Sequence, residues 1–197
     1  MTIKIYPLGA KLKDTLYNGT IGRYTTKSHK EGEFSVTGDT FIIRKVTELE
    51  QKGRLNEIKE KYSSMYQKMQ QMDNEFKKLI PTLFPKKYFR GIMGKENEGV
   101  RIIIQAKTGD IIMPDKGYAF ITKSKEIAHD YACYLDGSAR GENVLMEIIL
   151  PSGSKYSKNP LHLREAVMPR GAKYKVIDKK EADGMTHVVL KYLPYEK

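Results

Sequence analysis

The 197-residue chain carries a formal net charge of +11, is 40% hydrophobic and 30% charged, and is long enough to bury the core of one domain. This balance excludes a fibrous or an intrinsically disordered protein. The single cysteine, Cys133, excludes an intramolecular disulfide, and no Cys/His cluster has the spacing of zinc ligands, so a structural metal is not expected.

The hydropathy of the chain bears on its location. No run approaches the ~18 apolar residues of a membrane helix, and the first residues lack the apolar stretch of a secretory signal. We therefore expect a cytoplasmic monomer that does not span a membrane, in the producing cell or in a recipient cell. The basic charge suits nucleic acid, an acidic protein face or an anionic ligand, and suits a simply solvated surface equally well.

The first part of the chain divides into two segments. Residues 1–45 hold short β-prone runs at 3–6 and 41–43 between stretches rich in Gly, Thr, Lys and Ser, which predicts a β-prone extension. In residues 47–83 apolar side chains recur at spacings of three and four, which predicts one long amphipathic helix at the start of a domain spanning 46–197. This helix either packs on the protein's own core or forms a coiled coil between two chains.

Pro81 and Pro85 end that helix, and mostly strand-like sequence follows. One further helix is expected at 124–135. The order of a long helix followed by strands indicates an α+β fold with antiparallel or mixed sheets. The expected strands are 88–93, 100–106, 118–121, 144–150, 173–177 and 187–192.

Three short segments carry the candidate chemistry, and the first two surround Arg90 and Thr122. Arg90 ends an aromatic strand beside Gly91, where its guanidinium can hold a phosphate through paired hydrogen bonds or form a surface ion pair. After Thr122 the second strand turns into a helix. Ser124 is expected to cap that helix, whereas the Thr122 hydroxyl either holds a ligand or stabilises the turn.

The third segment places Glu165 before the apolar run 166–168 and the turn Pro169-Arg170-Gly171. A carboxylate at the mouth of a strand can stabilise a developing oxocarbenium ion, as in glycoside-cleaving enzymes. The alternative is a surface glutamate paired with Arg164 or Arg170.

The order of these segments over residues 83–193 resembles the mono-ADP-ribosyltransferases of the Arg, Ser-Thr-Ser, Glu type, which occur among bacterial toxins and phage-encoded enzymes. The resemblance implies two small packed β-sheets, NAD+ as substrate without a metal, and transfer of ADP-ribose to a macromolecular acceptor with release of nicotinamide. It implies that Glu165 is catalytic. It also implies a set of residues that hold NAD+, namely Arg90, Gly91, Tyr118, Phe120 and Thr122.

The chain departs from the family pattern at two places. Counted back from the helix, residues 120–122 stand where the family has Ser-Thr-Ser, and only Thr122 keeps a hydroxyl. Leu163 stands where the family often has Glu or Gln, which disfavours arginine as the acceptor. By resemblance the loop 151–162 meets the target, with Tyr156 and Leu163 as recognition residues.

Other functions are also compatible with the sequence. With water as acceptor the protein is an NAD glycohydrolase. The surplus of Lys and Arg suits a protein or nucleic-acid acceptor in nucleic-acid-associated machinery. A non-catalytic nucleic-acid-binding module is the main rival from another class. Its phosphate contacts would be Arg90, Arg101, Arg140, Arg164 and Arg170, and its stacking residues Tyr88, Phe89 and Tyr118.

Overall fold

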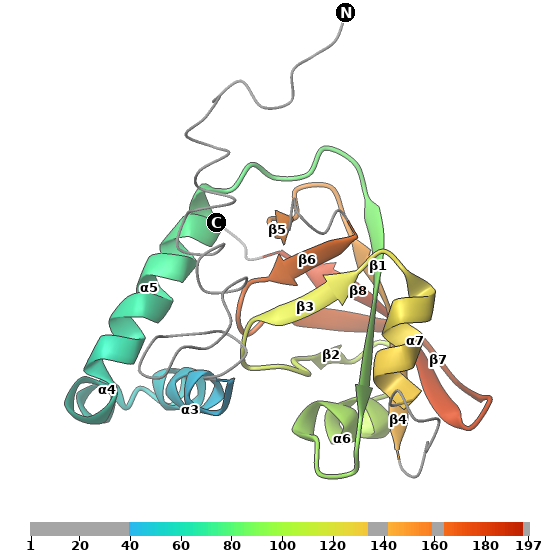
Figure 1. Ribbon diagram of the computed structural model, residues 1–197, viewed down its shortest axis with the longest axis horizontal. Helices are drawn as coiled ribbons and strands as arrows, with labels where there is room; N and C mark the ends of the chain where they lie inside the picture. The colour runs from blue at the N-terminus through green and yellow to red at the C-terminus, as the bar shows by residue number, and fades with distance from the viewer. Residues whose placement is uncertain (1–39, 134–141, 159–163, 195–197) are drawn as a thin grey trace, which may run out of the picture.

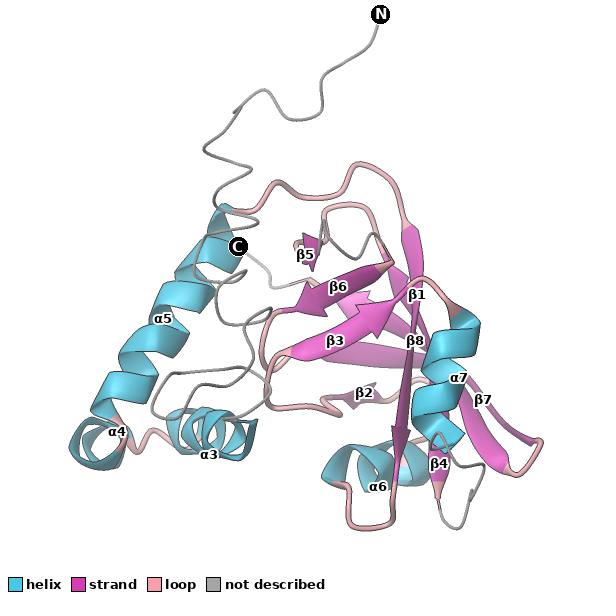
Figure 2. Ribbon diagram, viewed as in Figure 1, coloured by secondary structure: helices cyan, strands magenta, loops and turns pink. Residues whose placement is uncertain are grey.

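A computed structural model describes residues 40–133, 142–158 and 164–194 (Figures 1 and 2). Its helices are α3 Thr40–Gln51, α4 Leu55–Lys61, α5 Ser63–Lys78, α6 Glu98–Gln105 and α7 Lys125–Cys133. Its strands are β1 Lys86–Met93, β2 Ile111–Ile112, β3 Ala119–Thr122, β4 Asn143–Leu150, β5 Ser157–Lys158, β6 Glu165–Met168, β7 Lys173–Ala182 and β8 Met185–Leu193. Within these described ranges, no helix has the length and apolarity needed to cross a bilayer.

The single helix predicted for 47–83 is wrong, because the segment forms α3, α4 and α5. Gly53 has a φ of +70°, a left-handed conformation that ends α3. Tyr62, at φ −132° and ψ 20°, separates α4 from α5. The run 41–43, predicted as β-prone, lies inside α3. The periodicity nevertheless survives, since all three helices turn their apolar faces to one core.

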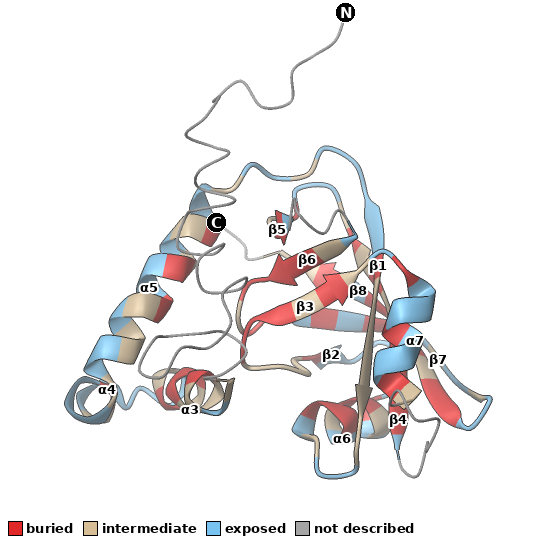
Figure 3. Cartoon of the chain, in the orientation of Figure 1, coloured by how far each residue is buried: buried red, intermediate tan, exposed pale blue. Residues whose placement is uncertain are grey.

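The alternative of an intermolecular coiled coil is not supported. Met69, Met72 and Phe76 of α5 are buried in a cluster that also contains Tyr118 and Val167 of the sheet region. The methionine stripe therefore packs within its own chain, where flexible side chains fill irregular space. Figure 3 shows the buried residues of α5 on the side that faces the sheet.

The predicted α+β class is confirmed, and the strands form one hydrogen-bonded series in the order β2-β7-β8-β4-β1-β3-β6-β5. The pair β4–β8 is parallel and the other pairs are antiparallel. The expected two small sheets are joined at a narrow link, because β1 and β3 share one register pair, Phe89 with Thr122. A five-stranded and a three-stranded part thus meet at this point.

The strand predicted for 100–106 is wrong, because the segment belongs to α6. The Asn97 side chain accepts a hydrogen bond from the Gly99 backbone N–H at 3.0 Å and so begins the helix. Val100 and Ile103 then fall on one buried face. A short apolar run is compatible with either a strand or a helix, and this cap decides for the helix. The strands expected near 88–93, 118–121, 144–150, 173–177 and 187–192 are confirmed as β1, β3, β4, β7 and β8.

Candidate functional site

The three motif segments lie on three adjacent strands, although they are far apart in the sequence. Arg90 is on β1, Thr122 ends β3 and Glu165 begins β6. Thr122 is the register partner of both Phe89 and Glu165. Since directly opposed residues point to the same side of a sheet, Phe89, Thr122 and Glu165 share one face. Arg90, one position along from Phe89, leaves β1 on the other face.

On that other face, Arg90 is part of a charged cluster with Asp115 and Arg44. Arg90 Nη2 lies 2.7 Å from Asp115 Oδ2. Arg44 of α3 donates through Nε and Nη2 to the two Asp115 oxygens, each at 3.2 Å. Burial of Asp115 opposes its ionisation, but the charge of Arg90 and the contacts of Arg44 prevail and hold the pKa of this carboxyl below its ordinary value. Arg90 therefore forms an ion pair, which was one of its two predicted roles, and the pair is partly buried.

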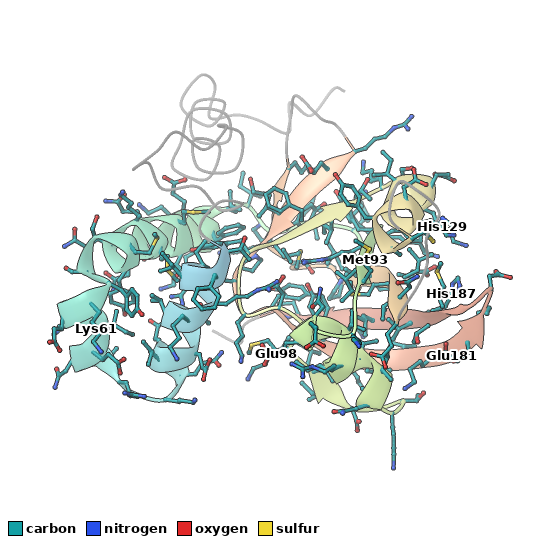
Figure 4. All side chains as sticks on the ribbon, turned by 60° about the horizontal axis from the view of Figure 1, so that its bottom comes forward. Lys61, Met93, Glu98, His129, Glu181 and His187 are labelled. Carbon is teal, nitrogen blue, oxygen red and sulfur yellow. The ribbon has the colours of Figure 1, made fainter. Side chains whose placement is uncertain are left out.

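The cluster borders a hollow at the surface. Its lining combines two guanidinium groups, one carboxylate and one amide with apolar side chains, and consists of Arg44, Arg90, Ile92, Asn97, Pro114, Asp115, Ala119, Met146, Ile148 and Tyr174. Lys116, next to Asp115, donates to Glu98 of α6 at 2.8 Å (Figure 4). This contact connects the loop before β3 to that helix. Two cations against one carboxylate leave this hollow positive, as a phosphate site requires.

The junction of β3 with α7 is fixed by two hydroxyls. Thr122 Oγ1 accepts from the Ser124 backbone N–H at 3.1 Å. Ser124 Oγ accepts from the Ile127 N–H at 3.2 Å and donates to Glu126 at 2.6 Å. The predicted capping role of Ser124 is thus confirmed. Thr122 takes part in the same turn while it stands opposite Glu165.

Gly91 has a packing role that the sequence did not reveal. A Cβ at this position would collide with the backbone oxygen of Ala128 and would lie 2.5 Å from the backbone nitrogen of Ala132. The glycine therefore lets α7 lie directly against β1 (Figure 1). This requirement explains the residue independently of any contact with a ligand.

Tyr118, predicted to bind NAD+, lies in the core between the helices and β3. It is 5% exposed, stacks on Phe76 with ring centroids 5.8 Å apart, and donates to Asp73 at 2.8 Å. Burial, together with the negative charge of Asp73, raises the pKa of its hydroxyl above the ordinary value. Phe120 packs against the same cluster. Both aromatic residues therefore stabilise the packing of the helices on β3.

The Pro-Arg-Gly turn is held by a buried arginine. Arg170 bonds Asp73 of α5 through Nε and Nη2, at 2.8 and 2.6 Å. It also bonds Thr47 at 3.1 Å and pairs with Glu50, both of α3. Burial alone would lower the pKa of the guanidinium, but the two carboxylates raise it above its ordinary value. Arg170 thereby fixes the helices against the turn that follows β6.

Of the two residues predicted to recognise the acceptor, the structure describes only Tyr156. Tyr156 is 7% exposed and meets Tyr88 edge to face at a centroid distance of 5.4 Å, so it serves the core and is not available to an acceptor. Its neighbouring strand β5 is short and pairs with β6, which keeps this segment against the sheet. Leu163 lies outside the described residues.

The structure removes the basis of the nucleic-acid-binding alternative. Tyr88 and Tyr118 are buried and cannot stack on bases, and Phe89 is partly buried against a second apolar cluster. Arg170 is engaged with Asp73 and Glu50, and the Arg90 side chain is only 19% exposed, in the hollow beside Asp115. The remaining arginines of the proposed set are Arg101 and Arg164, which are exposed, and Arg140, which lies outside the described residues. The set therefore does not form the aromatic and basic platform that single-stranded nucleic acid needs.

Several residues of this region were missed at the level of sequence, above all Arg44, Asp115, Asp73 and Glu50. Arg44 was hidden because its segment was interpreted as β-prone. A signal for Asp115 was present: the sequence Pro-Asp-Lys-Gly is typical of a turn, in which Asp accepts from the backbone two residues on. Asp115 Oδ1 does accept from Gly117 N–H at 2.8 Å.

Comparison with known proteins identifies the fold. Exoenzyme S from Pseudomonas aeruginosa, solved with human 14-3-3 protein beta and carba-NAD, matches with a TM-score of 0.54 and 16% identity, over 95% of this chain and 84% of that chain. Vis toxin, an ADP-ribosyltransferase from Vibrio splendidus, matches with a TM-score of 0.51 and 12% identity, over 93% and 84% of the two chains. No family sequence profile and no characterised protein sequence matches the chain. The chain has the ADP-ribosyltransferase fold, as the order of its motifs predicted.

Proposed function

We propose that this protein is a mono-ADP-ribosyltransferase that cleaves NAD+, releases nicotinamide and transfers ADP-ribose to a macromolecular acceptor. The observation that carries the proposal is the placement of Arg90, Thr122 and Glu165 on the adjacent strands β1, β3 and β6 of an ADP-ribosyltransferase fold, around the narrow link at which the two parts of the sheet meet. These are the residues that the sequence motifs singled out, in the same chain order.

Arg90 and Arg44 fit the diphosphate of NAD+. Guanidinium groups bind phosphate oxygens through paired, charge-assisted hydrogen bonds, and both groups point at one partly buried carboxylate. Asp115 pre-organises them, so less conformational entropy is lost when an anion binds. The cluster keeps one positive charge for the ligand after Asp115 is counted.

Glu165 is the proposed catalytic residue. When the bond between the ribose C1′ and the nicotinamide nitrogen breaks, its electron pair neutralises the pyridinium and leaves an oxocarbenium ion. A fixed carboxylate stabilises that cation more than it stabilises the ground state, which is the condition for a faster reaction. The acceptor nucleophile then bonds to C1′ and loses its proton.

Thr122 is proposed to take the place of the first motif serine, in a register two residues later than the sequence pattern suggested. The support is geometric: Thr122, not Phe120, stands opposite Glu165, and the strand-to-helix junction is made by Thr122 and Ser124. In this register Thr122-Lys123-Ser124 corresponds to Ser-Thr-Ser, and Phe120 precedes the motif. A hydroxyl beside the carboxylate can donate to it and hold its orientation.

The acceptor is proposed to be a macromolecule on the basis of the sequence motifs. Among the structural neighbours, Vis toxin has also been solved with agmatine, and exoenzyme S with 14-3-3 protein. For the present chain, Tyr156 is left out of the acceptor surface because it is buried. Leu163 stays in the proposal as the residue that disfavours an arginine acceptor.

Release of nicotinamide from NAD+ by the full chain tests the proposal. The wild type is compared with Glu165→Gln, and with Glu60→Gln as a control for an exposed glutamate on α4. We expect Glu165→Gln to lower turnover by a factor on the order of 10² or more, with little change in NAD+ binding. Glu60→Gln should retain wild-type turnover.

A second arm supplies cell lysate and NAD+ labelled in the ADP-ribose part. A labelled macromolecule supports the transferase, whereas nicotinamide release without any labelled component identifies an NAD glycohydrolase. No release by the wild type, with or without lysate, overturns the proposal.

A further inference from the structure

The connection between α5 and β1 has an apolar and basic sequence that the proposed chemistry does not use. From 77 to 87 it reads KKLIPTLFPKK, so two lysine pairs flank seven residues, and no acidic residue occurs in the segment. Ile80, Leu83 and Phe84 are 52%, 75% and 68% exposed. In Figure 3 this connection runs as an exposed stretch along the edge of the molecule. Large apolar side chains gathered in this way mark an interaction surface.

The backbone of this segment, here called the docking loop (residues 77–87), is held in place. Thr82 exchanges backbone hydrogen bonds with the next loop, donating to Ser154 O at 2.9 Å and accepting from Gly153 N–H at 2.8 Å. Ser152 Oγ donates to Leu83 O at 3.0 Å. The two prolines of the loop restrict its backbone further. These hydrogen bonds therefore fix the backbone from which the Leu83 and Phe84 side chains project into solvent.

Positive charge surrounds these side chains. Lys77, Lys78 and Lys86 are exposed, and Lys155 of the neighbouring loop donates to the Lys77 backbone oxygen. Lys87 pairs with Glu147 at 2.6 Å, and this pairing neutralises the Glu147 carboxylate. The surface around the exposed apolar side chains thus carries an excess of ammonium groups.

We propose that the docking loop binds an anionic lipid surface, with Leu83 and Phe84 entering the headgroup region and the lysines contacting the lipid charges. Apolar side chains within a basic surface are the pattern of peripheral membrane binding, and anionic lipids attract Lys close to the bilayer. A protein partner is less well matched, because protein interfaces are depleted in Lys and enriched in Tyr, Trp and Arg. The chemistry of the loop therefore selects a lipid surface as its occupant.

The docking loop lies beside the segment that is expected to meet the acceptor. The docking loop is hydrogen-bonded to residues 152–154, which begin the loop 151–162 that the motif resemblance assigns to acceptor contact. Membrane binding would hold that loop near acceptors at the bilayer surface. This consequence rests on the proposed function, whereas the binding itself does not.

Vesicle sedimentation of the full chain is the first test. We expect the wild type to bind vesicles of about 30% phosphatidylserine in phosphatidylcholine, and to bind pure phosphatidylcholine at least about tenfold more weakly. Leu83→Ser/Phe84→Ser should reduce binding to the anionic vesicles at least about tenfold. Phe41→Ser is the matched control, because Phe41 is 81% exposed on α3 and outside the loop; it should bind as the wild type does.

Charge variants separate local from overall electrostatics. Lys78→Gln/Lys86→Gln removes two charges from the docking loop, and Lys107→Gln/Lys175→Gln removes two exposed charges elsewhere. The first pair should weaken binding by about fivefold per lysine, and the second pair by much less. Equal weakening by both pairs overturns the proposal, because only net charge would then matter.

A tryptophan probe reports insertion directly, since the chain contains no Trp. The Phe84→Trp variant should shift its emission to the blue on anionic vesicles and be quenched by brominated lipid, whereas Phe41→Trp should show neither effect. The proposal is overturned if the wild type binds neither type of vesicle, or if vesicles leave the emission of the Phe84→Trp variant unchanged. Either result would favour a protein as the partner of the loop. Nicotinamide release without vesicles should be the same in all these variants, so this proposal and the enzymatic one can fail separately.

Discussion

Thr122 and Glu165 are direct partners across the antiparallel β3–β6 ladder. Their side chains leave the sheet on the same face, within reach of one another. β3 ends at Thr122, and β6 starts at Glu165, so both residues stand at the rim of the sheet, close to the start of α7. This relationship places a hydroxyl beside the proposed catalytic carboxylate and sets the first prediction.

Thr122→Val should lower nicotinamide release by about 10- to 100-fold, because it removes a hydroxyl next to a charged group and keeps the shape of the side chain. Phe120→Leu should change turnover by less than about threefold, since Phe120 packs against the helical core. Steady-state kinetics of both variants decide between the two registers. The opposite ranking would restore Phe120 as the residue at the first motif position.

Arg90→Lys should raise the KM for NAD+ by about tenfold or more, because an ammonium group cannot reproduce paired guanidinium contacts with phosphate. Arg44→Lys should have an effect in the same direction, since its guanidinium shares Asp115 with Arg90. Arg101→Lys, on the exposed side of α6, is the control and should leave the KM unchanged. Equal KM values for all three variants would remove Arg90 and Arg44 from the proposed phosphate site.

Gly91→Ala should destabilise the protein by about 3 kcal/mol or more, because the new Cβ meets the backbone of α7 and neither element can shift freely. Urea unfolding monitored by circular dichroism measures this change. Gly117→Ala is the matched control: its Cβ would meet the Asp115 carboxylate oxygen at 3.3 Å and side-chain carbons at 3.6 Å and beyond, so a smaller loss is expected. If both alanine variants unfold at the same urea concentration, α7 is not pressed against β1 at Gly91.

Acid should destabilise the fold through Asp115. Its folded-state pKa lies below the ordinary value of 3.8, so the ion pairs contribute their full stability above about pH 4 and lose it as the pH falls through the lower folded value. Each unit of depression corresponds to about 1.4 kcal/mol. Urea unfolding at about pH 7 and about pH 3 should show a smaller acid effect in Asp115→Asn than in the wild type. An acid effect of the same size in both would show that Asp115 is not the group responsible.

Glu50 adds to the same acid sensitivity. Burial opposes its ionisation, yet the hydrogen bond and charge of Arg170 keep its pKa below 4.5. Its contribution is therefore also present above the unfolded value and lost on acidification. Glu50→Gln should thus reduce the pH dependence of unfolding further when combined with Asp115→Asn.

Local sequence by itself determined the elements and motifs that depend on near neighbours. Apolar runs bounded by turn residues located β1, β4, β7 and β8, and the hydroxyl before the second helix located its cap at Ser124. The order of Arg90, the β3 segment and Glu165 indicated the ADP-ribosyltransferase fold. The strand and cap signals are local because hydrogen bonds to near neighbours and hydrophobic periodicity are set within one element.

Tertiary structure decided what depends on partners distant in the sequence. Periodicity alone could not show that α3, α4 and α5 are separate, because each presents the same apolar spacing to one core. The pairing of Arg90 with Asp115, 25 residues away, and of Arg170 with Asp73, 97 residues away, follows from which elements pack together. Strand register likewise placed Thr122 opposite Glu165, since pairing between strands is set by the burial of a whole face and not by the residues of either strand alone.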